Sequence, residues 1–106
     1  MSAADDRPGG SPVAGNPVSD NTARSRFELA LADGVAFIDY RRDGKRHLLL
    51  HAEVPPALRG RGIAAQLTAG ALQLVRAQGG SVEARCSYVA QFIAHNAQYQ
   101  DLLAKS

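Results

Sequence analysis

The stretch Leu58-Arg59-Gly60-Arg61-Gly62-Ile63-Ala64 lies between a strand-like segment that ends in two prolines and a long segment with helical periodicity. The N-terminus of a helix presents unpaired backbone N–H groups and a partial positive charge. Glycines at this point remove the side chains that would keep a phosphate away from those N–H groups, and the two arginines add permanent charge. The stretch therefore predicts a strand, a loop and a helix, with a phosphate or pyrophosphate site at the loop.

This loop differs from two common phosphate-binding loops. No Gly-Lys-Ser/Thr follows it, as a Walker loop would require. It also lacks the βαβ unit and the later acidic residue that accompany a dinucleotide-binding fingerprint. The alternative is a plain connection between strand and helix, in which the glycines only allow a tight turn. The local sequence leaves both interpretations open.

Downstream of the loop, the periodicity predicts a helix over about residues 62–78, ended by Gly79-Gly80. A short strand over 81–85 follows, then a helix from residue 87 and a last short helix around 99–103. The first helix carries an apolar stripe at helical spacing, formed by Ile63, Leu67, Ala71, Leu74 and Val75.

Upstream of the loop, the pattern predicts three strands, over 26–31, 35–40 and 46–54. Asp-Gly pairs between them indicate hairpin turns, and Pro55-Pro56 ends the third strand because neither residue can donate to a ladder. Simple alternation in the third strand puts residues 48, 50, 52 and 54 on one face and residues 47, 49, 51 and 53 on the other.

The resulting order, βββαβα, predicts the fold class. We expect an α/β (α+β) domain in which an antiparallel β-meander is followed by αβα. The connection from the third strand through the long helix to the fourth makes these two strands parallel. The length of 106 residues suits one such domain.

Residues 1–23 are rich in Ala, Gly, Pro, Ser, Asp and Asn and offer little apolar surface. They predict a disordered N-terminal tail, or alternatively an interaction arm, and leave residues 24–106 as the domain.

The composition limits the class of partner and the compartment. The formal net charge of +2 comes with scattered rather than clustered arginines, so no nucleic-acid partner is expected. A single cysteine, Cys86, cannot form an intrachain disulfide and fits a reducing compartment. No apolar run approaches the roughly 20 residues of a membrane span, and no secretory leader is visible. We expect a cytoplasmic monomer or weak dimer with no membrane partner and no metal.

Three motifs together resemble a known family. Arg59-x-x-Gly62-x-Ala64 matches the Gln/Arg-x-x-Gly-x-Gly/Ala signature of the GNAT (GCN5-related N-acetyltransferase) superfamily. The segments His51-x-Glu53-Val54-Pro55 and Cys86-Ser87-Tyr88-Val89, on either side of the loop, resemble its short YJDJ-type branch. The similarity covers residues 26–103.

The resemblance implies a minimal GNAT fold that binds acetyl-CoA. The third and fourth strands would splay apart, and the pantetheine arm would lie between them with the pyrophosphate on the loop. Asn96 is a further candidate for the cofactor channel. The predicted cofactor-binding residues are Val54, Arg59, Gly60, Arg61, Gly62, Ile63, Ala64 and Asn96.

Three residues are candidates for the chemistry. Acetyl transfer to an amine needs a neutral amine, a held thioester and a proton for the departing thiolate. Glu53 and His51 are candidate bases on one face of the strand; alternatively they are a solvated carboxylate and a packed histidine. Cys86 could accept the acetyl group or protonate the thiolate, or be a small buried residue. Tyr88 and Tyr99 are expected to be core aromatics with hydroxyls at the surface.

The sequence departs from the family pattern at three positions and in length. The short branch usually has proline where Ala84 and Ala97 stand, and the tyrosine acid of larger relatives falls at Ala94. The two helices that shape the acceptor site in larger relatives do not fit in this chain.

These features predict an N-acetyltransferase-like protein acting on an unidentified amine, either a small molecule or a protein. The alternative is a CoA-binding module with little or no turnover. A nucleic-acid adaptor using the Arg-Gly-Arg-Gly segment is a third hypothesis, and it predicts affinity that falls steeply with salt.

Overall fold

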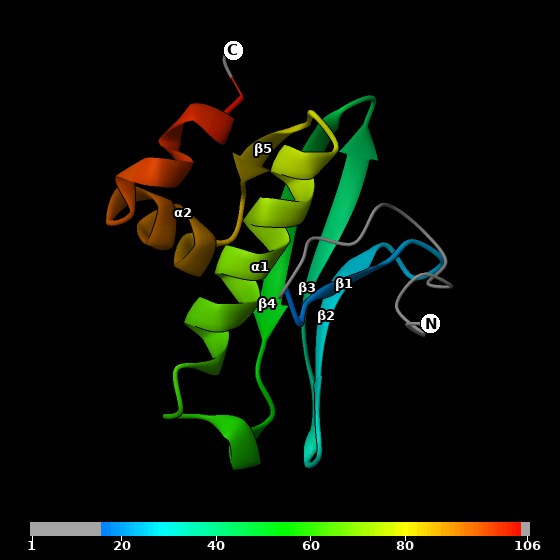
Figure 1. The fold of residues 1–106 in the computed structure, drawn as a ribbon, viewed down its shortest axis with the longest axis vertical. Coiled ribbons are helices and arrows are strands. Elements are labelled where there is room, and N and C mark those ends of the chain that lie inside the picture. The colour runs from blue at the N-terminus through cyan, green and yellow to red at the C-terminus, as the bar shows by residue number, and fades with distance from the viewer. Residues whose placement is uncertain (1–15, 105–106) are drawn as a thin grey trace.

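The computed structural model describes residues 16–104, and the predicted tail residues 1–15 lie outside the described residues. Strands and helices follow one another in a compact α/β arrangement (Figure 1). The elements are β1 (Ser19–Asn21), β2 (Arg26–Leu31), β3 (Gly34–Asp43), β4 (Arg46–Glu53), the 3-10 helix η2 (Pro56–Leu58), α1 (Ile63–Ala77), β5 (Ser81–Ala84), α2 (Ser87–Ala94) and the 3-10 helix η3 (Ala97–Leu102).

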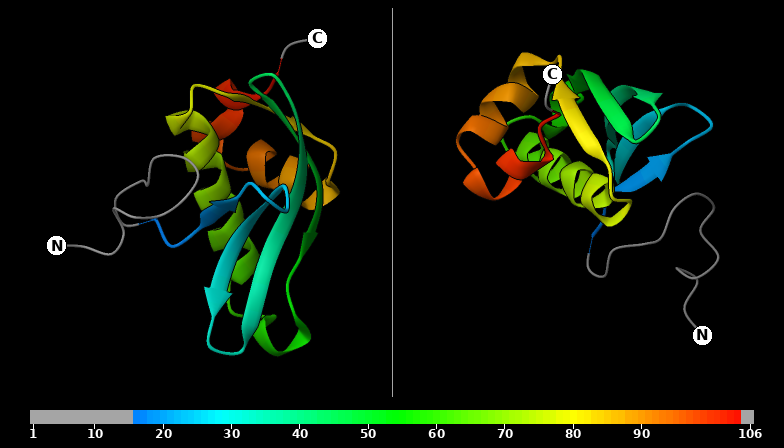
Figure 2. Two further views of the ribbon diagram at one scale, coloured as in Figure 1. Left: turned by 90° about the vertical axis from the view of Figure 1, so that its right-hand side faces the viewer. Right: turned by 90° about the horizontal axis from the view of Figure 1, so that it is seen from above.

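The strands form one sheet in the order β1-β2-β3-β4-β5. The first four strands are antiparallel to their neighbours, whereas β4 and β5 are parallel. Parallel neighbours require a crossover, which α1 supplies as it lies across one face of the sheet (Figure 2). The helices α2 and η3 pack beside β4, β5 and α1. The predicted meander followed by αβα is confirmed.

The N-terminal segment enters the fold earlier than the sequence predicted. Strand β1 pairs antiparallel with β2. Just before it, the Asn16 side chain donates a hydrogen bond to the Gly70 carbonyl of α1 at 3.0 Å and accepts one from the Val18 backbone N–H. A Cβ on Gly70 would lie 2.3 Å from Val18 Cγ2, so the close crossing of this segment over α1 depends on glycine. The predicted boundary at residue 24 therefore lies too late, because residues 16–23 belong to the domain.

A β-bulge in β4 corrects the predicted alternation of its side chains. Asp39 of β3 pairs with His51, but the next residue, Tyr40, pairs with Leu49, so Leu50 is left without a partner. One extra residue reverses which side chains face the core, since the side-chain period of a strand is two. His47 and Leu49 are buried on the α1 side, whereas His51 and Glu53, which simple alternation placed on the same face as them, are exposed on the opposite face. The bulged Leu50 is 41% exposed.

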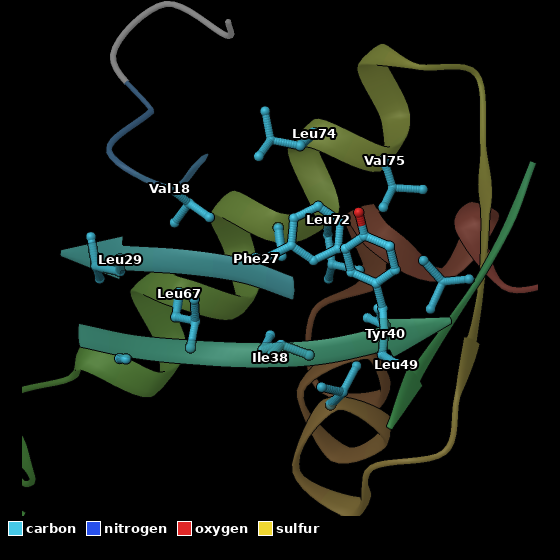
Figure 3. Packing of buried hydrophobic residues seen from close by; sticks show 14 of the residues in the cluster. Val18, Phe27, Leu29, Ile38, Tyr40, Leu49, Leu67, Leu72, Leu74 and Val75 are labelled. Atoms are coloured by element: carbon cyan, nitrogen blue, oxygen red, sulfur yellow. The ribbon is translucent and has the colours of Figure 1, made fainter. Parts of the chain in front are cut away.

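The core lies between the sheet and the helices (Figure 3). Phe27, Ile38 and Leu49 from the sheet are fully buried against side chains of α1. The predicted apolar stripe of α1 is confirmed, because Ile63, Leu67, Ala71, Leu74 and Val75 are all buried. Within residues 16–104, none of the helices combines the length and the apolar character that crossing a bilayer requires.

The His47 side chain is fully buried in this core, as is that of Thr68. It packs against the rings of Phe27 and Tyr40, at centroid distances of 5.9 and 5.2 Å. Neither ring nitrogen has a hydrogen-bond partner among the described residues. Burial lowers the pKa of His47, and the positive charge of Arg42 lowers it further, so the ring is held in its neutral form.

Candidate functional site

The pairing between strands β4 and β5 ends halfway along β4. Their parallel pairing runs from Arg46 and Ser81 to Leu49 and Ala84. There the Leu49 carbonyl accepts hydrogen bonds from the N–H groups of both Arg85 and Cys86, each at 2.9 Å. Beyond this point β4 continues to Glu53, whereas the chain after β5 turns into α2. The strands therefore splay, as the fold class predicted.

The glycine loop follows β4 and η2 and leads into α1. Gly60 and Gly62 have φ angles of 83° and 72°, in the left-handed region that favours glycine. A Cβ on either residue would meet no atom within 4 Å, so both face open space.

The backbone of this loop offers a row of hydrogen-bond donors. The first helical bond of α1 is donated by the Gln66 N–H to the Gly62 carbonyl, at 3.1 Å. Within the described part of the chain, the six N–H groups of residues 60–65 donate no backbone hydrogen bond. The first turn of α1 carries no acidic side chain. Free N–H groups at the positive end of a helix form a site for an anion.

A hollow of about 170 Å³ lies beside this row of donors. It includes six of the eight predicted cofactor-binding residues and three that the sequence did not assign to the site. Its lining consists of Val54, Leu58, Arg59, Gly60, Gly62, Ile63, Ala64, Ala65 and Tyr88.

The two arginines of the loop differ in their position. Arg59 lines the hollow, and its Nε donates a hydrogen bond to the Val54 carbonyl at 3.0 Å. This bond ties the loop to the end of β4. Arg61 is exposed and is not part of the lining, although it adds positive charge next to the hollow.

His51 and Glu53 form a pair on the part of β4 that lies beyond the bulge. The His51 Nε2 and Glu53 Oε1 atoms are 3.2 Å apart, and the side chains are 60% and 55% exposed. With the proton of a neutral ring on Nε2, this contact is a hydrogen bond to the carboxylate, and Nδ1 is left as a proton acceptor. The pair thus has the arrangement of a base and the group that orients it.

Cys86 lies where the two strands part. It is the N-cap residue of α2, half-buried, and its backbone N–H is one of the two that bond to Leu49. Its side chain packs against the core cluster and is not part of the lining of the hollow.

Asn96 is not brought to the hollow. Its side chain donates a hydrogen bond to the Phe92 carbonyl at 2.7 Å, at the C-terminal end of α2. Tyr88, near the N-terminal end of the same helix, lines the hollow and is 38% exposed. The expectation that Tyr88 is a core aromatic is therefore wrong, whereas Tyr99 is buried. Partial burial raises the pKa of Tyr88, so its hydroxyl stays protonated.

Comparisons with known proteins agree with this geometry. The family model of the GCN5-related N-acetyl-transferases matches residues 26–102. Protein NATD1 of Bos taurus is 36% identical over 92 residues, which cover 82% of this chain and 81% of that protein. An NMR structure of a GCN5-like protein from Staphylococcus aureus has a TM-score of 0.64 at 20% identity, covering 89% of this chain and 93% of the other.

The fold, with its splayed strands and its glycine loop, is that of an acetyltransferase of the GNAT type. The chain belongs to the GCN5-related N-acetyltransferase family.

Proposed function

We propose that this protein binds acetyl-CoA and transfers the acetyl group to an amine. The observation that carries the proposal is the row of backbone N–H groups at residues 60–65, beside a hollow that opens next to the splayed strands. Six neighbouring donors and the positive end of α1 suit a pyrophosphate. Apolar residues such as Val54 and Leu58 on the same wall suit the less polar arm of a CoA thioester.

The residues around the splay provide the proton transfers. Acetyl-CoA supplies the acetyl group as an activated thioester. His51 accepts the amine proton at Nδ1, and Glu53 holds the ring in the required tautomer through Nε2. Cys86, at the point where the strands part, donates the proton that the departing sulfur needs. The positive charge that Arg59 brings to the loop stabilises the bound phosphates.

The test is calorimetric titration of acetyl-CoA into the wild type and into Gly62→Glu. The variant puts a carboxylate beside the row of N–H groups, and like charges about 4 Å apart near a surface repel by roughly 4 kcal/mol. We expect the affinity to fall at least about 100-fold. Gly44→Glu is the matched control, because Gly44 also has a positive φ, of 62°, with no atom within 4 Å of its Cβ position. It should bind acetyl-CoA like the wild type.

The acceptor is tested next, by screening small amines and lysine peptides for acetyl transfer. His51→Gln, Glu53→Gln and Cys86→Ala should each lower the rate without changing the affinity for acetyl-CoA. Tight binding with no transfer to any amine would favour a CoA-binding module instead. A folded wild type that does not bind acetyl-CoA would contradict the proposal.

A further inference from the structure

The Tyr88 side chain packs against Phe92 and also lines the hollow. Its ring lies near the N-terminal end of α2, two residues after Cys86, and 38% of the residue is exposed. An exposed aromatic ring in the wall of a hollow offers a large apolar surface at little entropic cost. Within residues 16–104, its hydroxyl makes no hydrogen bond.

The Tyr88 ring is the first in a row of three packed aromatic rings, followed by Phe92 and Tyr99. The Tyr88 and Phe92 centroids are 6.4 Å apart, and those of Phe92 and Tyr99 are 5.9 Å apart. The Arg76 guanidinium lies 5.8 Å from the centre of the Tyr99 ring. This row runs along α2 to η3 and anchors the Tyr88 ring to α1. The ring is thus preorganised and need not be ordered when a ligand binds.

The remaining lining shows which part of a ligand would meet this ring. The loop N–H groups and Arg59 are the polar part of the wall and suit phosphates. The other side chains are aliphatic, among them Val54 and Leu58, and they suit a chain of methylene and amide groups. Tyr88 is the aromatic member of the lining, and it follows Cys86 by two residues in the chain.

We propose that Tyr88 is a positioning residue whose ring packs on the pantetheine arm of the bound CoA thioester, between the phosphate loop and Cys86. This inference rests on the proposed function. The ring fixes the direction in which the arm leaves the loop, so that the thioester arrives where β4 and β5 part. The contact is made by the face of the ring, and the hydroxyl is not required for it.

The test compares two ligands and two substitutions by calorimetry. CoA carries adenosine, a ribose 3′-phosphate, the diphosphate and the pantetheine arm, whereas ADP carries adenosine and the diphosphate but lacks the arm and the 3′-phosphate. Tyr88→Ala should weaken CoA binding about 10- to 30-fold and change ADP binding less than about 2-fold. Tyr88→Phe keeps the ring and should bind CoA within about 3-fold of the wild type. Leu103→Ala is the control, since Leu103 is similarly exposed at 40% but lies beside Val82 of β5 and is not part of the lining of the hollow; it should bind both ligands normally.

Each other result overturns the inference in a different way. Unchanged CoA binding by Tyr88→Ala shows that the ring does not contact the arm. Equal losses for CoA and ADP show that Tyr88 shapes the loop or the fold instead. Equal losses in Tyr88→Phe and Tyr88→Ala assign the effect to the hydroxyl. A folded wild type that does not bind CoA removes the proposed function and this inference with it, and that result is visible before any variant is made.

Discussion

The two halves of β4 serve different purposes although they belong to one strand. The first half, Arg46 to Leu49, pairs with β3 on one side and β5 on the other, and its His47 and Leu49 side chains are fully buried. The second half, His51 to Glu53, pairs with β3, whereas the pairing with β5 has already ended. The first half joins the antiparallel strands to β5, and the second half presents the side chains of His51 and Glu53, the proposed base and its partner, to solvent.

The bulge at Leu50 separates the two halves and explains the difference. It directly follows Leu49, the last residue of β4 that pairs with β5, so the change of face and the end of the pairing are one residue apart. With the bulge, His51 and Glu53 share the face opposite the core, while Leu49 remains inside. A bulge next to an active site commonly redirects side chains in this way.

The largest effect on stability is expected when leucine is replaced by alanine just before the bulge and, separately, at the bulge. Leu49→Ala removes a side chain that is 0% exposed and should lower the free energy of unfolding by about 2–5 kcal/mol. Leu50→Ala, one residue later, removes a side chain that is 41% exposed and should cost less than about 1 kcal/mol. Urea denaturation measures both values. Equal losses would show that the bulge does not separate a packed half from an open one.

A somewhat smaller effect is expected from Gly70→Ala in α1, away from the hollow. A new Cβ would lie 2.3 Å from Val18 Cγ2 and 2.6 Å from Asn16 Oδ1, so the N-terminal segment must move. Overpacking of this kind costs about 1–3 kcal/mol, even though alanine is the better helix former.

Two measurements on Gly70→Ala separate stability from binding. Urea denaturation should show the loss of stability, and hydrogen exchange should be faster in β1. Calorimetry should show unchanged affinity for acetyl-CoA, because Gly70 is not part of the lining of the hollow. A loss of affinity in a folded variant would mean that the segment before β1 also supports the site.

The sequence predicted the elements whose causes are local. The loop could be assigned because two closely spaced glycines between a strand and a helix are typical of left-handed backbone, and α1 because its apolar stripe is regular. The strand β1 could not, since its anchor is a hydrogen bond between Asn16 and Gly70, which are 54 residues apart. Polar composition alone gives no sign of such a contact.

Two features of the site were hidden for a different reason. The run Leu48-Leu49-Leu50 contains three identical side chains, so alternation cannot reveal which of them faces the core. Tyr88 stood in a recognisable motif, but its place in the hollow depends on how α2 packs against the rest of the domain. The orientation of α2 relative to the rest of the domain is set by tertiary packing.

The smallest of the three effects is the pH dependence of stability. It compares the two halves of β4 through His47 in the first half and His51 in the second. The pKa of buried His47 lies below its ordinary value of 6.5, mainly through desolvation and then through Arg42, while Asp20 and the backbone of Lys45 and Ser81 act weakly in the opposite direction. The unfolded chain therefore binds the proton first as the pH falls. This contribution to stability is complete above pH 6.5 and is lost progressively below it.

His47→Leu should remove this part of the pH dependence. Leucine has a similar volume and leaves no unpaired ring nitrogens in the core, so stability at pH 7.5 should change by less than about 1 kcal/mol. Urea denaturation at about pH 7.5 and 5.5 should then show a smaller difference for the variant than for the wild type. His51→Gln is the control, because that side chain is 60% exposed, and it should keep the wild-type difference. If His51→Gln alone removed the difference, the titrating histidine would lie in the open half of β4.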